Sequence, residues 1–260
     1  MNRKIWPLAV IAAVMICRAS ETASAPASGA SQASDLTADQ LIAKYEAARG
    51  GEQKLKGIQS VKMTGKWVNG ESSPAPVAVT IAPGRYLRRI DQGSDVPIVQ
   101  AVDGQAAWET SPPKGITKPS SMSDKDAARF RHLADPQGPL VNFRAKNNKI
   151  EVLGKQSWRS SQVYKLKVTF ADGGVNYIYL DAKSFLPVRV VSTLYLQHML
   201  MSKEAELEQV YEDFRDVDGV KWPFIEKASA PEVNFATTTS WEKIEVNKPV
   251  DASAFKQPKG

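Results

Sequence analysis

The stretch that decides the fold is residues 61–81, VKMTGKWVNGESSPAPVAVTI. Valine, methionine, glycine and tryptophan alternate with lysine and threonine at its start, and valines and isoleucine alternate again at its end. A period of two is typical of a strand with one buried face, and Asn69-Gly70 between the two runs favours a tight turn. Residues 61–81 therefore predict a β-hairpin, which Pro83-Gly84 ends.

The same signal recurs along most of the chain. Further alternating or short apolar runs, separated by turn residues, occur at 85–90, 98–102, 106–109, 150–153, 164–170, 177–180, 187–196, 205–214, 222–225 and 236–246. Closely spaced strands of this kind predict an antiparallel meander, and about eleven of them suffice for a strongly curved sheet. We therefore expect a mainly β protein whose curved antiparallel sheet forms an incomplete (half) β-barrel.

Two helices are predicted outside the strands. Thr37 and Gln40 have the spacing of a capping box, apolar residues follow at helical intervals, and Gly50-Gly51 supplies a left-handed stop. A second helix is expected at 123–133, after a loop rich in proline and glycine. Two helices cannot cover both faces of such a sheet. We therefore expect them to lie in its mouth as a lid, through Leu41, Tyr45 and Phe130.

The N-terminus has the order of a secretory signal. Arg3 and Lys4 precede an apolar run at 5–17, and small residues follow. The run is shorter than the roughly 20 residues that span a bilayer. We predict a signal peptide over 1–25, a flexible Ala/Ser/Gly/Pro-rich tether over 26–36, one half-barrel domain over 37–260, and export to the periplasm. Ala23-Ser24-Ala25 and Ser28-Gly29-Ala30 are both candidate cleavage sites.

Cys17 is the only cysteine of the chain. A membrane anchor through a lipidated Cys17 fits less well, because lipoprotein signals place a small residue before that cysteine and Ile16 stands here. If Cys17 leaves with the signal, the mature chain has no thiol. Disulfides, thiolate nucleophiles and cysteine metal sites are then excluded.

Composition argues against nucleic-acid binding and against catalysis. Loss of residues 1–25 lowers the formal net charge from +6 to +4, and the basic residues are spread along the chain. His132 and His198 are the only histidines, and neither has a partner pattern nearby, so we expect surface histidines. The sequence has no nucleophile elbow, phosphate loop or His-Glu-x-x-His motif. We expect a monomeric binding protein rather than an enzyme, without catalytic residues, metal or cofactor.

Two features suggest an apolar ligand. Residues 194–201, LYLQHMLM, place apolar side chains where a hairpin should turn, either at a cavity mouth or continuing core strands. Tryptophans on separate strands either line a common interior or are ordinary core residues. The candidate cavity-lining residues are the apolar, inward positions Met63, Trp67, Val79, Tyr86, Trp108, Leu166 and Val168.

The order of several short motifs resembles the LolA-like superfamily of outer-membrane lipoprotein-sorting proteins. Each motif is mostly turn chemistry, but together they span residues 37–258. They lie at 46–51, 61–65, 82–89, 102–104 with Trp108, 111–112, 179–181, 186–188, 217–219, 222–224 and 251–258. The resemblance implies an open half-barrel with helices as a lid, holding acyl chains in its hollow.

One position departs from the superfamily pattern. The resemblance implies an arginine directly before the strand-ending proline, where it fastens the lid, and this position is Ala82. Arg85, Arg88 and Arg89 lie nearby, but the sequence does not show that one of them substitutes. The lid-fastening mechanism is therefore not carried over to this chain.

The leading hypothesis is a periplasmic binding or shuttle protein for lipoprotein acyl chains or other lipids, which could meet a membrane surface or envelope transport components. A second hypothesis is an envelope sensor or protein-interaction module with the same fold and a filled interior. The third, an envelope hydrolase, would require a turnover that depends on His132.

Overall fold

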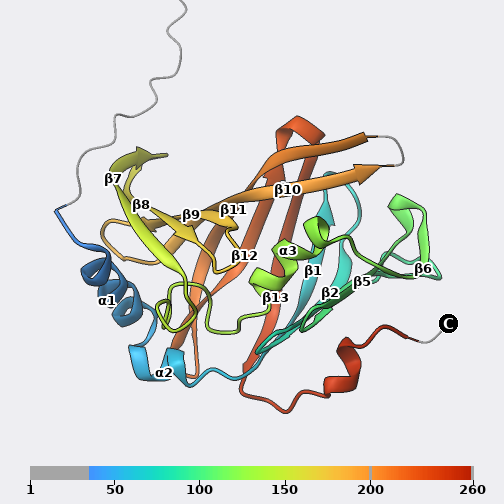
Figure 1. The fold of residues 1–260 in the computed structure, drawn as a ribbon, viewed down its shortest axis with the longest axis horizontal. Helices are drawn as coiled ribbons and strands as arrows, with labels where there is room; N and C mark the ends of the chain where they lie inside the picture. Colours follow the sequence, from blue (N-terminus) through green and yellow to red (C-terminus); the bar gives the residue numbers. More distant parts are fainter. Residues whose placement is uncertain (1–34, 199–200, 259–260) are drawn as a thin grey trace, which may run out of the picture. The chain divides into compact units, whose positions relative to one another are not determined.

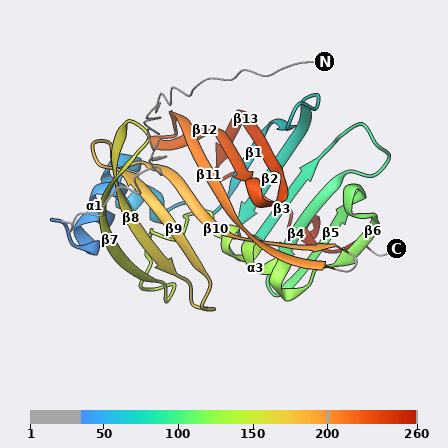
Figure 2. The same ribbon diagram turned by 90° about the horizontal axis from the view of Figure 1, so that it is seen from above.

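The strands form a single antiparallel sheet. The computed structural model describes residues 35–198 and 201–258, and thirteen strands follow one another in the order β6-β5-β4-β3-β2-β1-β13-β12-β11-β10-β9-β8-β7 (Figure 1). The edges β6 and β7 do not pair, so the curved sheet stays open (Figure 2). The strands are β1 (Val61–Asn69), β2 (Ala75–Ala82), β3 (Arg85–Ile90), β4 (Ile98–Asp103), β5 (Ala106–Ser111), β6 (Ile116–Ser121), β7 (Lys149–Trp158), β8 (Ser161–Thr169), β9 (Val175–Asp181), β10 (Pro187–His198), β11 (Met201–Val217), β12 (Val220–Ala230) and β13 (Phe235–Val246).

The predicted fold class is confirmed, with more strands than expected. The prediction of about eleven strands missed β6, because Pro119 and Gly115 mark this stretch as a loop. Proline cannot donate a hydrogen bond to a sheet, but an edge strand tolerates it. Strand β6 pairs only with β5, so Pro119 lies at such an edge.

The first helix begins and ends where the sequence predicts. In α1 (Ala38–Arg49) the Thr37 side chain accepts a hydrogen bond from the Gln40 backbone N–H, and Gln40 Oε1 accepts one from the Thr37 N–H at 2.8 Å. Gly50 ends the helix with φ 129°, and a β-carbon there would overlap the Gly219 carbonyl of the β11–β12 turn. The remaining helices are α2 (Glu52–Lys56), α3 (Asp124–Leu133) and the 3₁₀ turns η1 (Pro112–Lys114), η2 (Pro231–Val233) and η3 (Ala252–Phe255).

Helix α3 lies over the hollow of the sheet. Because β6 and β7 are opposite edges, the chain between them has to cross from one half of the sheet to the other. Helix α3 is part of this crossing and packs against β3, β4 and β10, burying Ala127 and Phe130 (Figures 1 and 2). The Phe130 ring lies 5.8 Å from that of Tyr86 on β3.

Three polar contacts fasten the C-terminal end of α3 to turns on both halves of the sheet. The Gly84 N–H, in the β2–β3 turn, donates to the Ala134 carbonyl at 2.9 Å. Arg131 donates to the Gln105 carbonyl in the β4–β5 turn at 2.8 Å. On the other half, His132 Nε2 lies 2.8 Å from Asp172 Oδ2 in the β8–β9 turn. The helix therefore bridges the two halves with few bonds.

The main hydrophobic core lies between the hollow face and the helices, but a second cluster occupies the opposite face. Trp108 packs there with Val99 and Ala101, and its indole N–H donates to the Phe255 carbonyl of η3 at 2.8 Å. Turn η3 packs against β3 and β4. Strand β4 is therefore buried on both faces, and Trp108 is placed away from the hollow.

We expect Trp108→Phe to lower the free energy of unfolding. The change leaves the buried Phe255 carbonyl without its donor, which costs about 1–2 kcal/mol. Urea unfolding measures that cost. Unchanged stability would show that the indole hydrogen bond contributes nothing.

A β-bulge bends the middle of the sheet. Where β1 pairs with β13, Gly65 lies opposite Trp241 while Thr64 lies opposite Lys243, so Glu242 is an extra residue. A β-carbon on Gly65 would overlap the Ser240 carbonyl. Bulges increase strand twist and re-aim side chains, and this one adjoins Trp241, whose side chain belongs to the core beneath the helices.

Several sequence predictions lie outside the described residues. These are the signal peptide, the tether before residue 35, Cys17 and the tip of the 194–201 segment at 199–200. Leu194, at the start of that segment, packs in a small cluster with Ala205 and Leu207. Within the described part of the chain, no helix has both the length and the apolar character needed to cross a membrane.

Candidate functional site

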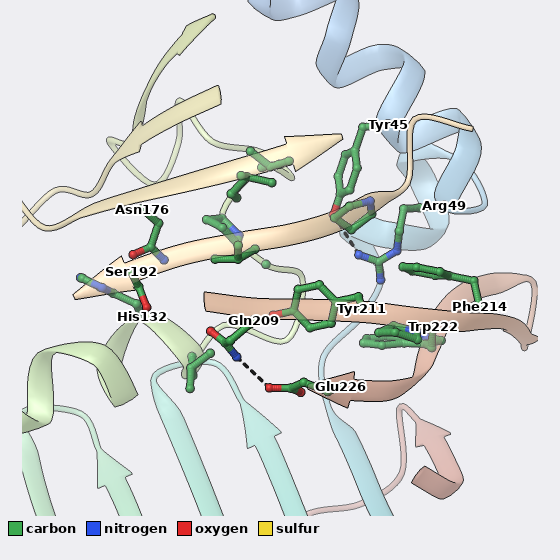
Figure 3. Close-up of a pocket in the computed structure, with 18 of the residues that line it drawn as sticks. Tyr45, Arg49, His132, Asn176, Ser192, Gln209, Tyr211, Phe214, Trp222 and Glu226 are labelled. Atoms are coloured by element: carbon green, nitrogen blue, oxygen red, sulfur yellow. Dashed lines mark hydrogen bonds between the residues drawn. The ribbon is translucent and has the colours of Figure 1, made fainter. Parts of the chain in front are cut away.

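The candidate site is a cavity with a volume of about 240 Å³ (Figure 3). It lies between the concave face of the sheet and the crossing segment, residues 122–148, which connects β6 to β7. We call it the main cavity. Strands β1 and β9 to β13 line it on the side of the sheet, and α1, α3 and residues 138–140 line the rest of this partly open cavity. Its walls are largely apolar and include Met63, Leu140, Ile178, Phe214, Trp222 and Trp241.

Arg49, the last residue of α1, reaches the wall of this apolar cavity. Its Nη1 donates to Tyr45 Oη at 2.8 Å, and its guanidinium carbon lies 4.9 Å from the Trp222 ring (Figure 3). The residue is only 8% exposed, and its Nε finds no hydrogen-bond acceptor in the described part of the protein. Stacking on aromatic rings and one phenol oxygen therefore stabilise this buried cation.

A second cavity of about 160 Å³ adjoins the first and shares Arg129, Gln209 and Glu226 with it. Gln209 Nε2 donates to Glu226 Oε1 at 2.7 Å. Burial, together with the neighbouring charge of Arg88, lowers the pKa of Arg129 to about 10, so that Arg129 stays protonated at neutral pH. These residues form a polar wall between the two cavities.

Tyr211 lines the main cavity beside this wall and stays neutral. Burial raises its pKa well above the ordinary value, and the nearby Glu226 carboxylate adds to the effect. The phenol can therefore donate a hydrogen bond at physiological pH. It cannot supply a negative charge there.

His132 is not an isolated surface histidine. Its side chain is 16% exposed, pairs with Asp172, and stacks on Phe170 with ring centroids 3.7 Å apart. Partial burial raises the pKa of Asp172, but hydrogen bonds from the Gly174 N–H and from His132 outweigh it and lower that pKa below its usual value. Ser192 Oγ, which lines the same cavity, has no hydrogen-bond partner among the described residues.

Asp172→Asn is expected to weaken the fold slightly at pH 7 and by less at pH 3. A carboxylate whose pKa is lowered by folding stabilises the protein above its unfolded pKa of about 3.9, and this contribution disappears as the pH falls through the folded pKa. Because the side chain is 51% exposed, solvent screening limits the effect to less than about 1 kcal/mol. Urea unfolding from pH 7 to 3 should show the two proteins converging. A difference in the free energy of unfolding that stays constant from pH 7 to 3 would contradict the lowered pKa of Asp172.

Three of the ten candidate site residues line one of the two cavities, and the other seven do not. Met63 and Tyr45 line the main cavity, and Phe130 lines the second. Trp108 lies apart on the outer face. The others belong to the continuous core around the cavities: Leu41, Trp67, Val79, Tyr86, Leu166 and Val168.

Sequence reasoning missed the polar residues of the site. Gln209 and Tyr211 alternate with Val210 along β11, and Glu226 and Trp222 are four residues apart on β12. The available signal was a set of polar residues at positions two or four apart within long strands. No group of three or more His, Cys, Asp or Glu that could hold a metal ion occurs among the residues with described positions.

Comparison of the whole structure with solved structures decides the fold. A LolA superfamily protein from Nitrosomonas europaea superposes with a TM-score of 0.54, covering 85% of this chain and 98% of that one at 13% identity. An outer membrane lipoprotein-sorting protein domain from Vibrio parahaemolyticus gives a TM-score of 0.56, with 84% and 97% covered at 10% identity. The protein has a LolA-like fold.

A third structure agrees. A DUF1329 family protein from Desulfovibrio piger has a TM-score of 0.55, with 83% and 97% covered at 11% identity. No protein-family profile and no curated protein sequence matches the chain. At such low identity the LolA-like fold is shown, and no residue role is transferred.

In the described structure, none of the arginines near Ala82 forms a hydrogen bond or ion pair with α3. Arg85 pairs with Asp103 at 2.7 Å, and Arg89 pairs with Asp91 at 2.7 Å. Arg88 lines the second cavity. The main-chain bond between Gly84 and Ala134 lies closest in sequence to the substituted position.

Proposed function

We propose that this protein is an exported periplasmic binding or shuttle protein for lipid or lipoprotein acyl chains. The observation that carries the proposal is the main cavity, an apolar chamber closed by α3 through a few bonds. Transfer of a methylene group out of water contributes about 0.8 kcal/mol, so about ten buried methylenes supply about 8 kcal/mol. This gain offsets the free-energy cost of association when that cost lies in the lower half of its range of about 4–15 kcal/mol. Binding of this kind requires no catalytic group.

Movement of the crossing segment would enlarge the chamber. The main cavity, about 240 Å³, lies below the usual range of small-molecule pockets, about 300–1,000 Å³. Displacing α3 breaks the three contacts to the sheet turns and joins the two cavities. A long acyl chain would then have room along the hollow.

The two tryptophans of the main cavity allow a direct test. A monoacylglycerol with a dibrominated stearoyl chain should quench the fluorescence of Trp222 and Trp241, because bromine quenches only at close range. The double variant Trp222→Phe/Trp241→Phe should lose most of the quenching, whereas Trp108→Phe, on the outer face, should keep it. Equal quenching in both variants would place the chain elsewhere, and no quenching in the wild type would argue against acyl binding.

The modest cavity volume favours a second candidate function. An envelope sensor or interaction module with this fold needs no space for cargo, and the core around the cavities is already well filled. This candidate predicts no binding of any acyl lipid, and the quenching experiment therefore separates the two.

A further inference from the structure

Two arginines that line the second cavity have no hydrogen-bond acceptor among the described residues. Arg88 on β3 and Arg129 on α3 both line the second cavity. Neither forms an ion pair with a carboxylate or donates a hydrogen bond within the described part of the chain, and Arg88 Nε is fully buried. The Arg129 guanidinium carbon lies 4.4 Å from the centre of the neighbouring Phe130 ring.

The other two arginines of β3 do have carboxylate partners. Arg85 and Arg89, also on β3, each have an aspartate partner at 2.7 Å. Removing a guanidinium from water without a counter-charge costs several kcal/mol, and two like charges side by side add to that cost. The lowered pKa of Arg129, caused by burial and by Arg88, reflects both effects.

The carboxylates around the second cavity are engaged elsewhere. Glu109 pairs with Lys114 at 3.0 Å, Asp126 accepts from the Ser123 hydroxyl at 2.6 Å, and Glu226 accepts from Gln209 at 2.7 Å. None of them hydrogen-bonds to Arg88 or Arg129 in the described structure. The acids of this wall therefore accept no hydrogen bond from either guanidinium group, and the nearby charge of Glu226 only partly opposes the fall in the pKa of Arg129.

A third polar group points to a ligand in the same place. Gln100 lies directly opposite Arg88 in the β3–β4 ladder and lines the second cavity. It is 8% exposed, yet its Oε1 has no hydrogen-bond partner among the described residues. An oxyanion with a neighbouring hydroxyl group would provide acceptors for the guanidinium groups and a donor for this oxygen.

We propose that the second cavity binds the oxyanion of an acyl lipid, a phosphate or a carboxylate, between Arg88 and Arg129, while the acyl chain lies in the main cavity. This inference rests on the proposed function and names its ligand class. The shared wall at Arg129, Gln209 and Glu226 is where the headgroup meets the chain. Planar guanidinium groups bind phosphate and carboxylate with two parallel hydrogen bonds, which makes such a pair selective for these groups.

The test compares three probes with the same dibrominated stearoyl chain: neutral monoacylglycerol, the free fatty acid and lysophosphatidic acid. The wild type should bind at least one anionic probe at least tenfold more tightly than the neutral one. Arg88→Gln and Arg129→Gln should each remove most of this preference, by weakening the binding of the anionic probe by a larger factor than that of the neutral probe. The matched control Arg85→Gln, on the same strand but paired with Asp103, should keep the preference.

Each outcome decides a different point. Preference for both anionic probes identifies any acyl oxyanion as the ligand, and preference for lysophosphatidic acid alone identifies a phosphate. Equal affinity for neutral and anionic probes overturns this inference and leaves the proposed function standing, whereas absence of all binding overturns both. Thermal unfolding guards against misfolding: removal of an unpaired buried charge should maintain or raise the melting temperature of the Arg129→Gln protein, and a loss of melting temperature would indicate a structural role instead.

Discussion

Ser192→Phe is expected to reduce acyl-lipid affinity about a hundredfold, about 2.7 kcal/mol, while the protein stays folded. Ser192 lies on β10, is 8% exposed and faces the main cavity (Figure 3). A phenyl ring there occupies much of the roughly 240 Å³ that the chain would need. Filling a cavity usually maintains or raises stability, so the binding loss should come without unfolding. Titration with the brominated monoacylglycerol and urea unfolding measure the two effects.

Ser192→Ala is the matched control. Its hydroxyl has no hydrogen-bond partner among the described residues, so its removal costs no protein hydrogen bond and leaves the cavity open. The alanine variant should bind as the wild type does. Tight binding by Ser192→Phe would show that the acyl chain does not lie in the main cavity.

Gly65→Val is expected to have the largest effect on stability, a loss of at least about 4 kcal/mol. A β-carbon at this position would overlap the Ser240 carbonyl and crowd the Trp241 backbone at the central bulge. The sheet cannot relieve that overlap without separating β1 from β13, the pair that joins the two halves of the meander. Because domains are stable by about 5–15 kcal/mol, this loss removes a large part of the stability, and the urea concentration at the unfolding midpoint should fall sharply.

The neighbouring residue provides the control for this prediction. The Lys66 side chain is 62% exposed, and its ion pair with Glu242 at 3.4 Å is of a kind that contributes little. Lys66→Val should therefore change the free energy of unfolding by less than about 1 kcal/mol in urea titrations. A similar loss for both variants would mean that strand composition, and not the close approach at Gly65, limits stability.

The alternation of apolar and polar residues was sufficient to predict the sheet and its curvature. This alternation does not predict the orientation of side chains where both faces of a strand are covered. Apolar residues then point to both faces, and the pattern does not tell the concave face from the outer face. Ala107 belongs to the main core and Trp108 to the outer cluster under η3, a contact with a segment almost 150 residues later in the sequence. It also failed at β6, where an edge strand tolerates a proline that normally signals a loop.

The candidate site was harder to predict than the fold. Apolar periodicity predicts the lining of the site, but most of the residues it selects belong to the hydrophobic core around the cavities, as Leu166 and Val168 do. The polar wall depends on contacts between residues far apart in sequence, such as Arg129 on a helix and Glu226 on a strand. The pairing of His132 with Asp172 spans 40 residues and leaves no local pattern. Side-chain packing, which no periodicity records, decides these positions.

The most direct test of the central claim is native mass spectrometry of the protein purified from the periplasm without detergent, followed by lipid extraction. Our account predicts one acyl lipid or acylated peptide per protein, or stoichiometric uptake of an added acyl lipid by the bare protein. A protein that carries nothing and takes up neither neutral nor anionic acyl lipids would contradict it.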